Sequence, residues 1–148
     1  MFDIMHRVGV KATPRQVYDA LATRDRLAGW WTSDTQGRTE AGGVIHFRFG
    51  DRGFIDTKVL ELKPEQRVVW EVTDGPAEWI GTRIIWALAP EGAGTTIRFM
   101  HQGWREQVDF MGHCSTKWAT FLMSLKAMLE TGKGAPFPND VLVSVDWD

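Results

Sequence analysis

A long amphipathic segment near the C-terminus most constrains how this chain can fold. Between Arg105 and Gly132 the apolar residues recur with the period of an α-helix, and at about 100° per residue they fall within one arc of about 120°. These residues are Phe110, Met111, Cys114, Trp118, Phe121, Leu122, Leu125, Met128 and Leu129. Gly132 is the expected C-cap, because glycine tolerates the left-handed conformation that ends many helices. A helix with one apolar stripe requires a second layer to cover it.

The residues before this helix predict that the second layer is a sheet. Residues 2–10 alternate between two faces, as in a half-buried strand, and His6 shares its face with apolar neighbours. Further strands are predicted at residues 44–49, 54–62, 68–72, 82–88 and 95–101. Their short connections carry turn residues, which favours antiparallel neighbours. A curved sheet wrapped around one long helix is the layout that this order indicates.

Three other segments complete the expected layout. Thr13 and Pro14 mark the start of a short helix, and Thr23 marks a second one that we expect to reach about Trp31. Residues 33–43 are polar and glycine-rich, so we predict a loop there. Residues 141–145 are expected to add a short edge segment. Without repeats or an obvious linker, residues 1–148 are interpreted as one domain.

Composition narrows the classes of function and the expected compartment. The single cysteine excludes an intramolecular disulfide and fits a reducing compartment. A formal charge of −2 without a Lys/Arg run argues against nucleic-acid binding. No apolar run approaches the roughly 20 residues of a membrane span, and the N-terminus lacks the order of a signal peptide. A cytoplasmic location is therefore expected. No metal-ligand spacing or nucleotide motif is present, so we expect neither metal nor cofactor.

Eight tryptophans are the unusual feature of the composition. Because an indole N–H needs a partner when buried, this number indicates either a large aromatic core or a cavity with aromatic walls. Trp79 and Trp147 lie outside the inferred core, beside a turn and in the tail. Exposed aromatic patches often mark interfaces, so we expect the tail to pack on its own domain or on a second copy, as in a homodimer.

The ordered motifs of the chain resemble the START-like, or SRPBCC, superfamily, and within it the family named after the activator of the heat-shock chaperone ATPase. The matching segments are 14–21 (PRQVYDAL), 27–31 (LAGWW), Gly42-Gly43, 62–70 (LKPEQRVVW), 88–96 (LAPEGAGTT), 101–104 (HQGW), and Trp118 leading to 125–132 (LKAMLETG). The resemblance implies an α+β helix-grip fold, in which a curved antiparallel sheet of about six strands wraps around the C-terminal helix. It also implies a cavity between sheet and helix.

The candidate ligand-binding residues face the expected cavity by alternation or by position in the resembled fold. Because the first and last strands of that fold are antiparallel neighbours, His6 and His101 are expected to lie close together on the concave side as polar anchors. One of Trp30 and Trp31 is expected to face the cavity mouth and the other the core. Cys114 is interpreted as a buried thiol rather than a nucleophile. The full set is His6, Trp31, Phe47, Phe49, Val59, Trp70, Trp86, Phe99, His101, Met111, Cys114, Trp118 and Phe121.

The leading functional hypothesis is a non-catalytic protein that holds a small apolar ligand, aromatic or lipid-like, between sheet and helix. The first alternative is a cyclase- or dehydratase-type enzyme that uses the two histidines as acid and base. The second alternative is an interaction module that assists a chaperone. The superfamily contains proteins of each kind, so the fold alone does not decide among them.

Overall fold

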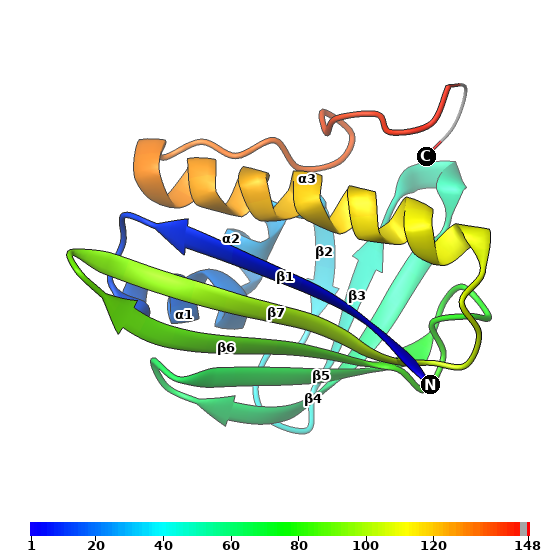
Figure 1. Ribbon diagram of the computed structural model, residues 1–148, viewed down its shortest axis with the longest axis horizontal. Coiled ribbons are helices and arrows are strands. Elements are labelled where there is room, and N and C mark those ends of the chain that lie inside the picture. Colours follow the sequence, from blue (N-terminus) through cyan, green and yellow to red (C-terminus); the bar gives the residue numbers. More distant parts are fainter. Residues whose placement is uncertain (146–147) are drawn as a thin grey trace.

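One long helix lies across a curved antiparallel sheet in the computed structural model, which describes residues 1–145 and 148 (Figure 1). The strands are β1 (Phe2–Val10), β2 (Asp34–Gly37), β3 (Val44–Arg48), β4 (Phe54–Lys63), β5 (Arg67–Asp74), β6 (Arg83–Glu91) and β7 (Gly94–Trp104). The helices are α1 (Pro14–Ala22), α2 (Arg24–Ala28), the 3₁₀ turn η1 (Gly50–Arg52) and α3 (Asp109–Thr131). This arrangement is the helix-grip fold that the sequence predicted.

The strand order is β1-β7-β6-β5-β4-β3-β2, and every pair is antiparallel. The first strand therefore pairs with the last, with His6 opposite Phe99 and Ile4 opposite His101. The prediction that His6 and His101 lie on neighbouring strands, with side chains on the concave side, is confirmed. Both side chains contact α3.

The seventh strand, β2, lies in the segment that we predicted to be a loop. It pairs with β3 from Asp34 opposite Arg48 to Gly37 opposite Ile45. Only Thr35 of its four residues is buried, so the segment has no apolar alternation that a sequence pattern can detect. Pairing with a neighbour, rather than the intrinsic preference of its residues, makes this segment a strand.

The first helix begins as predicted and the second ends earlier. The Thr13 hydroxyl accepts from the Gln16 N–H while the Gln16 side chain accepts from the Thr13 N–H, which is a complete capping box. Helix α2 ends at Ala28, and Trp30 and Trp31 follow it in a turn. As expected, one indole faces the core and the other a cavity: the Trp30 indole N–H donates to the Ala20 carbonyl, and Trp31 lines the pocket described below. Because Trp30 and Trp31 are not in a helix, their indole rings can stack, with ring centroids 5.9 Å apart. Both side chains are buried.

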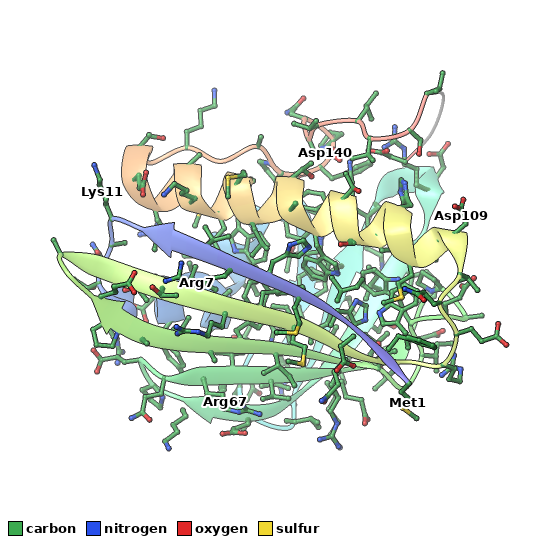
Figure 2. All side chains as sticks on the ribbon, in the orientation of Figure 1. Met1, Arg7, Lys11, Arg67, Asp109 and Asp140 are labelled. Carbon is green, nitrogen blue, oxygen red and sulfur yellow. The ribbon has the colours of Figure 1, made fainter. Side chains whose placement is uncertain are left out.

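Side chains fill the space between sheet and helix (Figure 2), and many of the buried ones are aromatic. All seven tryptophans in the described part of the chain are buried, and Trp147 lies outside it. The expectation that Trp79 is exposed is wrong, because its side chain is only 6% accessible. The loop that carries it folds back against the domain, where the Arg105 guanidinium donates to the carbonyls of Ala77 and Ile80.

The C-terminal tail packs on its own domain, which was one of the two predicted arrangements. After α3 it runs back along that helix toward η1 (Figure 1). Residues 141–145 form no strand, so that expectation is wrong. The tail pairs instead through Phe137, whose N–H donates to the Trp31 carbonyl at 2.8 Å and whose carbonyl accepts from the Ser33 N–H at 3.1 Å.

Candidate functional site

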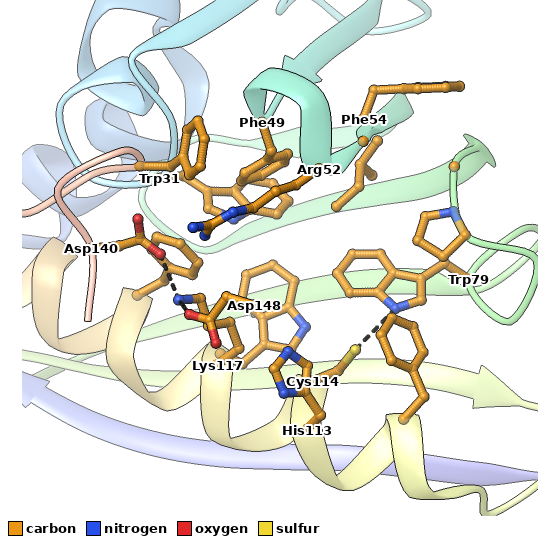
Figure 3. A pocket seen from close by; sticks show the side chains of 18 residues that line it. Trp31, Phe49, Arg52, Phe54, Trp79, His113, Cys114, Lys117, Asp140 and Asp148 are labelled. Atoms are coloured by element: carbon orange, nitrogen blue, oxygen red, sulfur yellow. Dashed lines mark hydrogen bonds and ion pairs between the residues drawn. The ribbon is translucent and has the colours of Figure 1, made fainter. Parts of the chain in front are cut away.

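A pocket of about 740 Å³ opens at one end of the interface between sheet and helix (Figure 3). Its aromatic lining is Trp31, Phe49, Phe54, Trp79, Phe110, Trp118, Phe121 and Phe137. Its polar lining is Arg52, His113, Cys114, Lys117, Asp140 and Asp148. The walls come from α3, the start of β4, η1, the loop between β5 and β6, and the tail. The pocket is thus apolar on most sides and charged at one end.

Helix α3 supplies one whole wall because its lining residues recur at helical spacing. Phe110, Cys114, Trp118 and Phe121 follow one another at intervals of three or four residues, which places them on a single face. Lys117 lies at the edge of that face, where its long side chain reaches the tail. The apolar stripe that drives helix packing therefore also forms the pocket wall.

The opposite rim depends on a close contact between η1 and the tail. Gly50 has a positive φ of 61°, and a Cβ placed on it would lie 3.3 Å from the Phe137 ring. A larger residue there would strain the turn and push the ring away. Arg52 extends from the same turn, with its guanidinium carbon 5.4 Å from the centre of the Phe137 ring. The two segments together form one edge of the pocket.

The tail is fixed to the domain by a shared serine as well as by Phe137. The Ser124 hydroxyl on α3 donates to the Trp30 carbonyl at 2.8 Å and accepts from the Ala135 N–H at 2.7 Å. It therefore connects α3, the turn after α2 and the tail at one point. Gly134 allows this approach, because a Cβ there would lie 2.5 Å from the Gly29 carbonyl oxygen.

A buried ionic cluster closes the polar end of the pocket. The Lys117 ammonium donates to Asp140 Oδ2 at 2.5 Å, to the Val141 carbonyl at 2.6 Å and to Asp148 Oδ2. The side chains of Lys117, Asp140 and Asp148 are only 15%, 3% and 1% exposed. An ammonium has three protons to donate, and these three acceptors use all of them. Lys117 therefore holds the tail over the pocket.

Cys114 lies in the pocket wall as a protonated, buried thiol. Burial raises its pKa to about 12, although the indole N–H of Trp79, 3.4 Å from the sulfur, acts in the opposite direction. A thiol with this pKa contains almost no thiolate near neutral pH, and the thiolate is the nucleophilic form. This agrees with the interpretation of Cys114 as a packing residue.

Behind the pocket, His101 is the centre of a buried hydrogen-bond chain. The Trp118 indole can only donate, so His101 Nδ1 accepts its proton at 3.2 Å. The ring proton therefore resides on Nε2, which donates to the Thr82 hydroxyl at 2.7 Å, and that hydroxyl donates to the Trp79 carbonyl at 2.5 Å. Burial lowers the pKa of His101 to about 3, so the ring is neutral.

The predicted site residues divide into two groups. Five of the thirteen line the pocket: Trp31, Phe49, Cys114, Trp118 and Phe121. The other eight lie outside its lining: His6, Phe47, Val59, Trp70, Trp86, Phe99, His101 and Met111. Of these, Phe99 and Trp86 pack against Trp118 with ring centroids 4.5 and 6.1 Å away, so aromatic rings occupy the middle of the interface.

The two histidines do not meet at a common point. The His6 Nε2 lies 3.1 Å from the Ser115 carbonyl oxygen on α3, and both nitrogens of His101 are engaged in the buried chain. Sequence reasoning also missed Arg52, Lys117 and Asp140. The sequence contains only a weak indication that Lys117 belongs to the site, because it lies beside the apolar stripe, next to Trp118. No neighbouring residue predicts that the tail covers it.

The described residues give no metal centre and no membrane segment. Within 1–145 and 148, His, Cys, Asp and Glu side chains form no group of three that could hold a metal ion. In the same residues, no helix combines the length and the apolar character needed to cross a membrane.

The fold and pocket define a helix-grip protein with an aromatic pocket whose polar end is covered by its own tail. Residues 11–130 match the family described as activator of Hsp90 ATPase homolog 1-like proteins, and the chain belongs to that family. The predicted resemblance is thereby confirmed. A search among curated proteins gave no match.

Solved structures support the same assignment. The Aha1 dimer from Colwellia psychrerythraea, determined in solution, is 47% identical, with a TM-score of 0.84, over 90% of this chain and 100% of that one. A protein from Staphylococcus saprophyticus is 20% identical, with a TM-score of 0.74, over 90% of this chain and 95% of that one. CalU16 from Micromonospora echinospora is 19% identical, with a TM-score of 0.72, over 85% and 73% respectively. The last two show a shared fold only.

Proposed function

We propose that this protein binds a small, largely apolar molecule in the pocket between α3, η1 and the tail. The observation that carries the proposal is the lining itself: eight aromatic side chains surround about 740 Å³, with charged groups gathered at one end. Ligand sites of small molecules have this volume and this mixture, because apolar walls supply affinity and a few polar groups supply orientation. A ligand that buries about 200 Å² of apolar surface there gains about 5 kcal/mol.

The geometry argues against the acid–base alternative that uses His6 and His101 as acid and base. General acid–base catalysis needs titratable groups within hydrogen-bond reach of one reacting point. His6 and His101 are outside the pocket lining, and the low pKa of His101, about 3, keeps it from forming the imidazolium that a general acid needs near neutral pH. Cys114 does line the pocket, but its high pKa suppresses the thiolate that covalent catalysis requires.

Native mass spectrometry of the protein purified from its own host tests the proposal. We expect the wild-type chain to carry a bound small molecule and Ile55→Trp to lose it. Ile55 lines the pocket, and the larger tryptophan side chain there would fill the space that the molecule occupies. Ile85→Trp is the matched control, since Ile85 lies on β6 outside the lining and should leave the bound mass unchanged. A wild-type protein without bound mass, and without a melting shift on addition of aromatic and aliphatic probes, contradicts the proposal.

A second candidate function is assistance to a chaperone, and the family description favours it. The 47% identical relative is also named Aha1. The test is the ATP hydrolysis rate of an Hsp90-family protein with and without this chain. A rate that rises in proportion to added chain supports the candidate, and an unchanged rate across a concentration series rejects it.

We also propose that the protein forms a homodimer, since the same relative was solved as a dimer. Light scattering at micromolar concentration gives the mass directly. A mass near twice 16.8 kDa is expected, and a monomeric mass throughout the concentration series contradicts the proposal.

A further inference from the structure

The polar end of the pocket contains one charged acceptor atom that the protein leaves unused. Oδ1 of Asp140 has no hydrogen-bond partner in the described residues. It is buried, since the Asp140 side chain is only 3% exposed. Its other oxygen accepts from Lys117. Leaving a buried acceptor without a donor is costly, and more so for a charged group. Asp140 lines the pocket, so a rotation of its carboxylate is enough to present this buried atom to a bound molecule.

Lys117 and Asp148, the two charged groups bonded into the same cluster, are already satisfied. Lys117 uses its three protons on Asp140, Val141 and Asp148. Asp148 accepts from Lys117 with one oxygen and from the N–H groups of Val143 and Ser144 with the other. An anionic ligand could pair with Arg52, but beside Asp140 it would meet the unpaired carboxylate oxygen, which repels it. A ligand that donates a hydrogen bond needs only the free oxygen of Asp140.

The charge at this end favours a neutral donor over a cation. Two cations, Lys117 and Arg52, accompany two carboxylates, Asp140 and Asp148, so their formal charges cancel. The Arg52 guanidinium extends toward the side of the pocket where Asp140 lies (Figure 3). It would repel a second cation there.

The donor must also sit against an aromatic wall. The Lys117 nitrogen lies 5.3 Å from the centre of the Phe121 ring, so the ionic cluster directly adjoins the apolar part of the pocket. We propose that the ligand is a neutral aromatic alcohol, such as a phenol, whose ring packs on this wall while its hydroxyl donates to Asp140 Oδ1. This inference rests on the proposed small-molecule function and assigns its ligand class.

Two probes of nearly equal size test the inference: 2-naphthol, which donates a hydrogen bond, and 2-methoxynaphthalene, which cannot. Calorimetric titration of the wild-type protein should show 2-naphthol binding at least about tenfold more tightly. In Asp140→Asn the amide oxygen is expected to face Lys117, which puts the NH₂ group where the free acceptor was. The preference for 2-naphthol should then fall to within about twofold. Asn139→Ala, an exposed neighbour in the same tail, should retain it.

The outcomes separate this inference from the one on which it rests. If both probes bind with equal affinity, the pocket binds apolar molecules but the donor assignment is wrong. If 2-naphthol keeps its full advantage in Asp140→Asn, its hydroxyl binds elsewhere and the assignment is again wrong. If neither probe binds the wild-type protein, the small-molecule proposal fails together with the inference. Melting curves of each variant verify that the comparison is made on folded protein.

Discussion

The indole nitrogen of Trp118 lies 3.2 Å from Nδ1 of His101, and this hydrogen bond joins the long helix to the last strand inside the core. It continues through Thr82 to the Trp79 carbonyl, so one chain of donors and acceptors links α3, β7 and the loop before β6. Every member of the chain is buried. Buried polar chains of this kind stabilise a fold only when each member is satisfied.

Trp118→Phe should cost about 1–3 kcal/mol of unfolding free energy, because it removes the donor and leaves His101 Nδ1 unpaired. Trp118→Ala should cost about 3–5 kcal/mol, since it also deletes a large packed side chain. Denaturant melts measure both. Trp104→Phe is the matched control: Trp104 is equally buried, but its N–H has no partner among the described residues. Equal losses for the two Trp→Phe variants would show that the bond to His101 contributes nothing.

The low pKa of His101 predicts a specific dependence of stability on pH. In the unfolded chain His101 titrates near its usual pKa of 6.5, whereas in the fold its pKa is about 3. Between these values the unfolded state binds one more proton, so stability must fall as pH decreases from 6.5 toward 3. The slope is about 1.4 kcal/mol per pH unit for this group.

The comparison with His101→Gln isolates that slope. Other titrating groups act in both proteins and cancel in the difference between their pH profiles. Denaturant melts from pH 6 to pH 4.5 should therefore give a steeper loss of stability for the wild type. Parallel profiles would mean that His101 is not held neutral by burial.

The Cys114 thiol should stay unreactive in the folded protein. Burial raises its pKa to about 12, so it remains protonated even at pH 9. Ellman's reagent should label less than one thiol per chain in native buffer and one per chain in guanidinium. Trp79→Phe should leave the native thiol unreactive, because burial rather than the indole controls its protonation. Rapid labelling of the native wild type would contradict this account.

Lys117→Met should release the tail from the domain. Removing one partner of a buried ion pair costs about 3–5 kcal/mol if the other stays buried, so the tail lowers that cost by detaching. Hydrogen exchange in residues 133–145 should accelerate while α3 remains protected. Lys126→Met is the control, because Lys126 lies on the same helix but bonds to Glu130 and the Gly9 carbonyl, away from the pocket. Unchanged exchange in Lys117→Met would show that other contacts hold the tail.

The sequence predicted the parts of the fold that local periodicity determines. The stripe on α3, the Thr13 cap and the alternating strands all follow from residues a few positions apart, and each is present. The strand β2 and the burial of Trp79 were missed because pairing with β3 and the contacts of Arg105 determine them. These are tertiary contacts without a local pattern.

The pocket was predictable only in part for a related reason. Trp31, Trp118 and Phe121 lie on apolar faces that the sequence reveals. Lys117 and Asp140 are 23 positions apart, and nothing in either segment predicts that they meet. His6 and His101 were predicted as ligand anchors because imidazoles can bind and transfer protons. In the structure, His101 instead forms hydrogen bonds with Thr82 and Trp118 that hold core elements together.

Most of the pocket wall and the segment that covers its polar end lie in different regions of the chain. The matched family region spans residues 11–130 and contains η1, α3 up to its penultimate residue and seven of the eight aromatic lining residues, whereas Phe137 and Asp140 follow it. The charged end of the pocket is therefore built jointly, by Arg52 and Lys117 from the family region and by Asp140 and Asp148 from the segment that follows it. A change confined to this short segment would alter one end of the pocket without replacing a residue of α3 or of the sheet.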